Sequence, residues 1–317
     1  MAVATSIHMT FRAILLIGAL AATGCGTEGI NHGGTGGGSG DGGGGSAGGG
    51  GGGTGGSAGG GGGGGQTGCG GQGAGCYTVY AHADHVLYSI DLNAKMLVTV
   101  GPFKAPKVGS SEDTITDLAV GPDNTIYVVS KTNIYTASPI DGHVTLLGPI
   151  GTCGSDNVAM SLTPDGKLVL GDFKGAVCHV DTTTMPPTVT QVGMLGQGMA
   201  LSGDLVAVAD GTVYGTGYLI ADGNTKGTGL NNVLVKLDPA TGQMLSQIGP
   251  TGFPKLFGVA YALGEVFGFT HDGTGDVVTI DPKTGKGTLF GSFKDPSTNM
   301  GISFAGAGVN PMVSPIP

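Results

Sequence analysis

Apolar and polar residues alternate along short stretches of this chain, and tight turns join the stretches. In "VLVKLDPATGQMLSQIG", residues 233–249, apolar side chains recur at alternate positions on both sides of "LDPATG". In that turn Asp238 can accept backbone N–H bonds, Pro239 presets φ, and Gly242 can adopt a positive φ. The stretch therefore predicts a β-hairpin.

The same hairpin pattern occurs five times. Each copy has a turn residue and a closing glycine ten to twelve residues later, and the pairs are Asp91 and Gly101, Ser138 and Gly148, Asp181 and Gly193, Asp238 and Gly249, and Asp281 and Gly291. The turn residues are 47, 43, 57 and 43 positions apart. A period in the forties is typical of a propeller blade with four strands.

Two more apolar strands precede each hairpin, as in "DLAVGPDNTIYVVS", "GMALSGDLVAVA" and "FGVAYALGEVFGFT". The first unit lacks its innermost strand, and "MGISFAGAG" at residues 300–308 has the composition to supply it. We therefore expect an all-β fold, a β-propeller of five four-stranded blades closed by the C-terminal strand, because closure removes exposed sheet edges. The 57-residue interval predicts an insertion over residues 211–232, within the fourth blade.

The "PDG" and "DPxTG" turns, together with the apolar first strands, resemble bacterial propellers of the NHL and YVTN kind over residues 77–308. The resemblance implies a binding or scaffolding module, since most members are of that kind and a minority are enzymes such as lactonases and lyases. It carries no catalytic residue to this chain.

Glycine content and charge divide the chain and exclude one class of partner. Of 68 glycines, 30 fall between Gly33 and Gly75, where no side chain is large enough to build a core. We expect a signal peptide over 1–24, a flexible linker over 25–75, the propeller over 76–308 and a tail over 309–317. The net charge of -9 and the absence of tryptophan leave no basic surface for nucleic acid.

The N-terminal stretch "FRAILLIGALAATGC" has one basic residue, a short apolar core and then small residues. This pattern predicts an export signal rather than a membrane-spanning helix. "LAATGC" resembles a bacterial lipobox, which implies that Cys25 is lipidated and that the mature chain is anchored to a lipid bilayer. An outer-membrane or cell-surface location is the preferred expectation, a periplasmic-facing location is retained, and an unlipidated secreted protein is the alternative.

Four cysteines remain after Cys25: Cys69, Cys76, Cys153 and Cys178. Export permits disulfides, and local pairing favours Cys69–Cys76 and Cys153–Cys178 among three connectivities. The spacing does not match a zinc site.

Polar residues near the starts of the first strands are the candidates for chemistry at the axial channel. These candidate ligands of a cation such as calcium are Asp117, Asp156, Asn157, Gln197 and Asn299. Aligning the first strands places Ala159, Gly198, Gly258 and Gly301 opposite Asp117, so no second carboxylate is expected there. Strand caps and turn formation are therefore the favoured roles of these residues.

Two weaker signals lie elsewhere. Asp222 and Asn224 alternate as in a calcium loop, but Lys226 stands where a third oxygen ligand belongs. His82 and His85 in "HADH" would point to opposite faces of a strand, which favours ordinary surface positions over a metal pair.

Together these patterns favour a monomeric, membrane-tethered binding or scaffolding module without a cofactor, whose ligand is a protein, a glycan or a small molecule. The alternative is a lactonase-like hydrolase or lyase that uses a cation in the channel.

Overall fold

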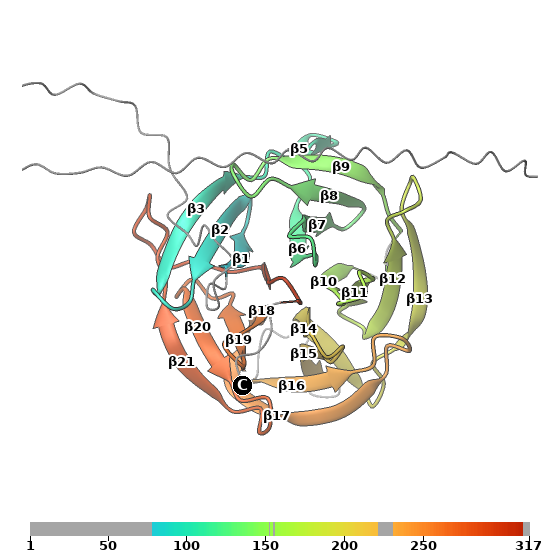
Figure 1. Ribbon diagram of the computed structural model, residues 1–317, viewed down its shortest axis with the longest axis vertical. Coiled ribbons are helices and arrows are strands. Elements are labelled where there is room, and N and C mark those ends of the chain that lie inside the picture. The colour runs from blue at the N-terminus through green and yellow to red at the C-terminus, as the bar shows by residue number, and fades with distance from the viewer. Residues whose placement is uncertain (1–77, 152, 155, 221–230, 313–317) are drawn as a thin grey trace, which may run out of the picture. The chain divides into compact units, whose positions relative to one another are not determined.

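A computed structural model describes residues 78–151, 153–154, 156–220 and 231–312. Its strands form five four-stranded antiparallel sheets arranged in a ring around a central axis (Figure 1). The chain is thus a five-bladed β-propeller, and the predicted fold is confirmed. No helix within the described ranges is both long enough and apolar enough to cross a membrane.

Each blade has its innermost strand at the axis and its outermost strand at the rim of the ring (Figure 1). From the axis outward, blade 1 contains β22 (Gly306–Gly308), β1 (Thr78–Ala83), β2 (Val86–Asp91) and β3 (Met96–Pro102). Blade 2 contains β6 (Ile115–Val120), β7 (Ile126–Ser130), β8 (Asn133–Ala137) and β9 (Val144–Pro149). Blade 3 contains β10 (Asn157–Leu162), β11 (Leu168–Asp172), β12 (Ala176–Asp181) and β13 (Thr188–Met194).

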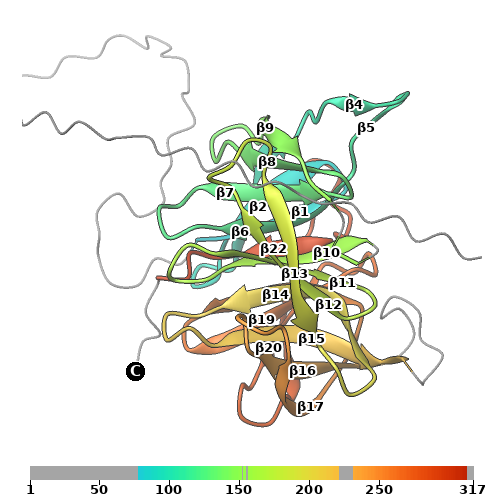
Figure 2. The ribbon, with the colours of Figure 1, turned by 90° about the vertical axis from the view of Figure 1, so that its right-hand side faces the viewer.

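Blade 4 contains β14 (Met199–Ala207), β15 (Val213–Leu219), β16 (Asn231–Leu237) and β17 (Met244–Pro254) in the same order. Blade 5 contains β18 (Leu256–Ala262), β19 (Glu265–Thr270), β20 (Asp276–Ile280) and β21 (Gly287–Ser292). A small hairpin of β4 (Lys107–Val108) and β5 (Ser111–Glu112) extends away from the blades between β3 and β6 (Figure 2).

The C-terminal strand closes the ring, as the sequence predicts. β22 pairs with β1, with Gly308 opposite Tyr80 and Gly306 opposite His82. The strand is shorter than the stretch "MGISFAGAG", and Ile302 and Phe304 of that stretch precede it as buried core residues. Closure therefore joins the two ends of the propeller through one short segment of small residues.

The predicted insertion in blade 4 is wrong in part. Residues 213–219 form β15, which pairs with both β14 and β16, and Asn231 and Asn232 begin β16, so most of the described residues of the stretch 211–232 belong to the blade. The stretch "GMALSGDLVAVA" is correspondingly one strand, β14, rather than two strands around a turn. Two features explain the error: "SGD" has turn chemistry, and the alternating glycines of "VYGTGYL" weaken its strand pattern.

The hairpin turns have the predicted chemistry. Asp238 accepts hydrogen bonds from the Ala240 N–H (2.9 Å) and the Thr241 hydroxyl (2.8 Å), and Gly242 has φ of +69°. Asp281 accepts the equivalent bonds from the Lys283 N–H and the Thr284 hydroxyl, each at 2.8 Å. These aspartates therefore shape turns.

The closing glycines have a role that the repeat alone does not reveal. A Cβ on Gly193 would overlap the carbonyl oxygen of Thr241, which lies in the hairpin turn of the next blade. A Cβ on Gly249 would likewise overlap the carbonyl oxygen of Thr284, whereas a Cβ on Gly291 would meet nothing within 4 Å. Neighbouring blades thus approach so closely at Gly193 and Gly249 that only glycine fits there, whereas the space beside Gly291 would hold a side chain.

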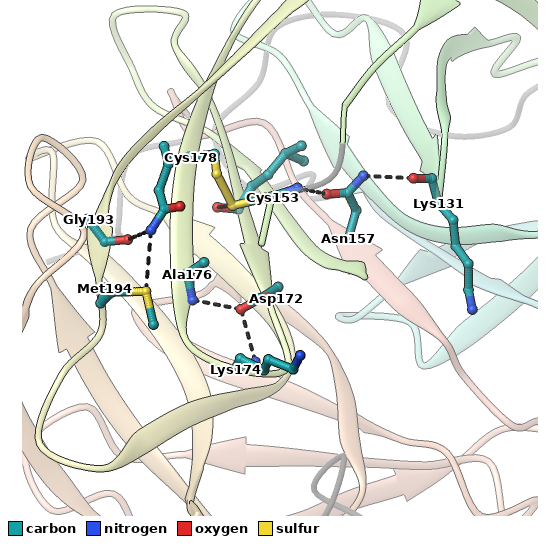
Figure 3. Close-up of a disulfide and its surroundings, with 11 residues drawn as sticks. Lys131, Cys153, Asn157, Asp172, Lys174, Ala176, Cys178, Gly193 and Met194 are labelled. Atoms are coloured by element: carbon teal, nitrogen blue, oxygen red, sulfur yellow. Dashed lines mark hydrogen bonds between the residues drawn. A yellow bond between two sulfur atoms is a disulfide. The ribbon is translucent and has the colours of Figure 1, made fainter. Parts of the chain in front are cut away.

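Apolar clusters fill the spaces between adjacent blades, and a disulfide reinforces one of them. The cluster between blades 2 and 3 contains Ile134, Met160 and Leu170 together with Cys153 and Cys178. Cys153 and Cys178 are joined with a Cα–Cα distance of 5.7 Å, so this predicted pairing is confirmed (Figure 3). The other predicted pair, Cys69–Cys76, lies outside the described residues, as does Cys25.

Candidate functional site

Two carboxyl groups meet at the axis of the propeller. Asp117 lies on β6 of blade 2, and Asp204 lies on β14 of blade 4. Both side chains have 0 % exposure, and they lie against adjacent residues of the closing strand: Asp117 Oδ1 packs against Gly306, and Asp204 Oδ2 accepts the Ala307 N–H. The two carboxyl groups are close enough for the charge of Asp204 to raise the pKa of Asp117. A buried acid pair is unusual in a protein core and marks this point as the candidate site.

A bulge in β14 brings Asp204 to the axis. The register runs from Leu201 opposite Gly217 to Leu205 opposite Gly215, so Ser202, Gly203 and Asp204 together oppose Thr216. Extra residues in one strand of a pair re-aim the side chains that they carry. The bulge therefore turns the Asp204 carboxyl toward the neighbouring blades instead of along its own sheet.

Backbone N–H groups from three blades hold the Asp204 carboxyl. Val259 of blade 5 (2.8 Å) and Ala307 of blade 1 (3.1 Å) donate to Oδ2, and Leu205 donates to Oδ1 at 2.6 Å. In contrast, Asp117 Oδ1 accepts one such bond, from the Leu118 N–H at 2.8 Å. Asp117 Oδ2 has no N–H or O–H donor among the described residues.

Burial raises the pKa of both axial carboxyl groups. For Asp117, the loss of hydration is the largest cause of the shift, and the charge of the neighbouring Asp204 adds to it. The pKa of Asp117 therefore lies well above the ordinary range. For Asp204, burial also raises the pKa, but the hydrogen bonds from Asp117 and the three backbone N–H groups oppose the shift. Burial therefore disfavours the ionised form of both groups, and more hydrogen bonds oppose this effect at Asp204 than at Asp117.

His82 lies beside this pair and contradicts its expected surface position. It is fully buried on β1, and its ring packs edge-on against Phe103 with centroids 5.6 Å apart. Neither ring nitrogen has a hydrogen-bond partner of normal geometry in the described part of the chain. Burial lowers the pKa of His82 to about 3, an effect that nearby backbone of Asp84 and Thr116 opposes only weakly, so the ring is neutral.

Gly306 of the closing strand separates these side chains. A Cβ at this position would overlap Asp117 Oδ1 and come within 2.8 Å of His82 Nε2. Asp117 and His82 thus both lie against Gly306, and the lack of space there explains why this position of the closing strand is a glycine.

The other predicted channel residues do not gather at the axis. Asn157 is buried, but its Oδ1 accepts the Cys153 N–H (2.8 Å) and its Nδ2 donates to the Lys131 carbonyl (3.3 Å), so it holds a loop (Figure 3). Asp156 forms an ion pair with Lys131 at 3.4 Å. Gln197 and Asn299 are exposed turn residues with positive φ. Asp222 and Asn224 lie outside the described residues.

The sequence alignment of the first strands missed Asp204. The strand register confirms Ala159 and Gly258 at the level of Asp117. Gly198 and Gly301 lie outside the innermost strands, and the residues that meet Asp117 from blades 4 and 1 are instead Asp204 and Gly306. The signal that could have revealed Asp204 is the acidic residue in "LSGDL", which stands in an otherwise apolar strand.

The axial side chains do not fit a cation. Within the described residues no three histidine, cysteine, aspartate or glutamate side chains come together as metal ligands. The N–H groups around Asp204 point their hydrogens at its oxygens, an arrangement that stabilises a carboxylate without a metal. The geometry instead suits a hydrogen-bonded junction between blades.

A surface cavity lies next to this junction. It has a volume of about 550 Å³ and is bounded by the β1–β2 hairpin, the start of β6, the residue after β19 and the connection from blade 5 to blade 1. Its lining residues are Ala83, Asp84, Val86, Tyr88, Thr114, Ile115, His271, Asp295, Thr298, Gly301, Ile302, Ser303 and Ala305. A second cavity of about 330 Å³ lies between turns of blades 3 and 4, beside Lys167, Asp210 and Ala240.

The larger cavity presents hydroxyl and carboxyl groups next to an aromatic stack. Its His271 ring stacks on Phe257 with centroids 4.7 Å apart, and its Nδ1 lies 2.8 Å from the Phe304 carbonyl oxygen. The Tyr88 hydroxyl donates to Asp295 at 2.6 Å across the same cavity. The described lining contains no lysine or arginine, so the cavity suits a ligand that donates hydrogen bonds.

Comparison with known proteins assigns no family to this chain. No protein-family model and no curated protein matches the chain. The crystal structure of selenomethionine-substituted virginiamycin B lyase from Staphylococcus aureus is similar at a TM-score of 0.38 and 11 % identity, over 68 % of this chain and 64 % of that one. The chain thus spans less than two thirds of that lyase. Its class, a five-bladed β-propeller, follows from its own sheet topology.

Proposed function

We propose that this protein is an exported, lipid-anchored propeller that binds a small hydroxyl-bearing ligand, such as a unit of a glycan. The cavity of about 550 Å³ is the observation that carries the proposal, because cavities of 300–1,000 Å³ hold small ligands. Its acidic and hydroxyl groups would accept hydrogen bonds from sugar hydroxyls, and the stacked His271 and Phe257 rings offer an apolar surface nearby. The Cys153–Cys178 disulfide supports an oxidising compartment.

Binding is tested by blocking one cavity at a time. Thr114 is exposed and lines the larger cavity, and Ala240 is exposed and lines the smaller one, so each accepts a tryptophan with little effect on the core. We expect calorimetric titration with a panel of mono- and disaccharides to detect binding that Thr114→Trp abolishes and Ala240→Trp retains. No binding to the parent chain, or loss only in Ala240→Trp, would contradict the assignment.

Lipid anchoring is tested on the mature chain from bacterial membranes. We expect its mass to correspond to a chain that begins at Cys25 and carries acyl groups, and we expect Cys25→Ala to leave the membrane fraction as an unacylated protein. Cys69→Ala is the matched control, because it removes a cysteine of the same glycine-rich region and should remain membrane-bound. An unmodified N-terminus in the parent protein would reject the anchor and leave a secreted form.

The alternative is a hydrolase or lyase that depends on a channel cation. It predicts that calcium chloride raises the unfolding temperature and that Asp117→Asn abolishes this increase. The binding proposal expects no calcium effect that depends on Asp117, since the axial groups are engaged with backbone N–H groups and with each other.

A further inference from the structure

Polar groups from four of the five blades meet at the axial carboxyl pair. Blade 2 supplies Asp117 and blade 4 supplies Asp204, while the backbone N–H groups that reach them come from Leu118 of blade 2, Leu205 of blade 4, Val259 of blade 5 and Ala307 of blade 1. The pair therefore joins the closing strand to blades 2, 4 and 5 by polar contacts.

Two buried carboxyl groups this close to each other favour retention of a proton. Two carboxylates are acceptors only, so a hydrogen bond forms between them only when one is protonated. Asp204 has its oxygens directed at three N–H donors, which stabilise its ionised form. Asp117 Oδ2 has no donor among the described residues. The proton therefore lies on Asp117, which donates to Asp204.

We propose that Asp117 and Asp204 share one proton that locks the ring, and that loss of this proton weakens the closure between blades 4, 5 and 1. Deprotonation would place two negative charges side by side in a fully buried position, where each repels the other and neither is hydrated. The Val259 and Ala307 N–H groups bind the same oxygen of Asp204, so movement of this carboxyl releases both. The proposal concerns the stability of the ring and does not depend on the ligand cavity.

No other charged group faces the pair from the described strands around it. β1 carries His82 and Tyr80 toward this region, and both are neutral, because burial lowers the pKa of His82 to about 3 and raises the pKa of Tyr80. β10 and β22 contain no titratable side chain, and Tyr261, the titratable residue of β18, stacks on Tyr214. β6 and β14 contribute only the two aspartates. The charge on the pair is thus set by its own proton.

The direction of the pH dependence follows from the raised pKa values. The folded protein holds a proton that the unfolded chain releases above about pH 4, so the stabilisation is complete below that pH and declines as pH rises. His82 acts in the opposite direction, since only the unfolded chain protonates it between about pH 3 and 6.5. Measurements at pH 7–9 therefore isolate the carboxyl pair from this histidine.

The test is urea unfolding of the purified chain at pH 7, 8 and 9. For the parent protein we expect the unfolding equilibrium constant to rise with pH, by up to about tenfold per pH unit for each proton that the folded protein retains and the unfolded chain has lost. Asp117→Asn keeps a donor to Asp204 but removes the proton that Asp117 holds, so this increase should become clearly smaller, and the part that remains reports the raised pKa of Asp204. Asp113→Asn is the matched control: Asp113 is a buried carboxylate outside the axis that accepts bonds from Asn133 and Tyr135, and its removal should leave the pH dependence unchanged.

Two results would overturn the proposal: a parent protein whose stability is constant over pH 7–9, or an Asp117→Asn variant with the parental pH dependence. If Asp117→Asn does not fold, infrared spectroscopy of the parent protein decides the question. A protonated carboxyl C=O band at pH 7 that weakens as pH rises supports the shared proton. A spectrum with only ionised carboxylates at pH 7 rejects it.

Discussion

Replacing Asp204 with alanine is expected to lower the free energy of unfolding by about 3–5 kcal/mol. The substitution leaves the N–H groups of Val259 and Ala307 buried without their acceptor, and it leaves Asp117 without the carboxyl that it contacts. These groups belong to three different blades, so the loss acts on ring closure rather than on a single sheet. Urea unfolding followed by circular dichroism at pH 6 measures the effect.

Asp238→Ala is the matched control for this variant. Asp238 also accepts backbone and hydroxyl donors, but it lies in an exposed hairpin turn where water can replace it. We expect a decrease of about 1 kcal/mol or less. If Asp204→Ala and Asp238→Ala destabilise the protein equally, the axial carboxyl has no special role in joining the blades.

Replacing Gly193 with alanine is expected to lower the free energy of unfolding by about 1–3 kcal/mol, whereas Gly291→Ala should change it by about 0.5 kcal/mol or less. The two glycines occupy the same position of the repeat. The methyl group at 193 would overlap the Thr241 carbonyl oxygen of the next blade, and backbone cannot move aside as a flexible side chain can. The methyl group at 291 would enter open space.

Parallel denaturation of the two variants separates steric contact from backbone freedom. Neither glycine has a positive φ, so alanine introduces no left-handed strain at either position. Gly249→Ala should behave as Gly193→Ala does, because its methyl group would overlap the Thr284 carbonyl oxygen. Equal losses for Gly193→Ala and Gly291→Ala would show that the repeat needs glycine for a reason other than contact between blades.

Local patterns were sufficient to predict the blades. Alternating apolar residues, the Asp238-type turns and the period of the repeat depend on neighbouring residues, so they are visible in the sequence and are confirmed in the structure. The Cys153–Cys178 disulfide was predictable for the same reason, since both cysteines lie within one repeat. The lipobox, the linker and the site at Asp222 and Asn224 stay predictions, as they fall outside the described residues.

The error in blade 4 arose where local and tertiary requirements differ. "SGD" has the composition of a turn, but its three residues form a bulge, because Asp204 gains N–H donors from two other blades. The glycines of β15 weaken its strand pattern, yet a Cβ on Gly215 would come within 2.7 Å of a Leu205 methyl group, so packing within the blade requires them.

The sequence by itself determined the hairpins, their five-fold repetition and the use of the C-terminal segment to close the ring, because each depends on short-range alternation or turn chemistry. Only the tertiary structure decided which residues meet at the axis. Asp117 and Asp204 are 87 positions apart and lie in different blades, and His82 and Gly306 join them from the two ends of the propeller. Their meeting depends on the curvature of the ring and on a bulge whose geometry is set by contacts between blades.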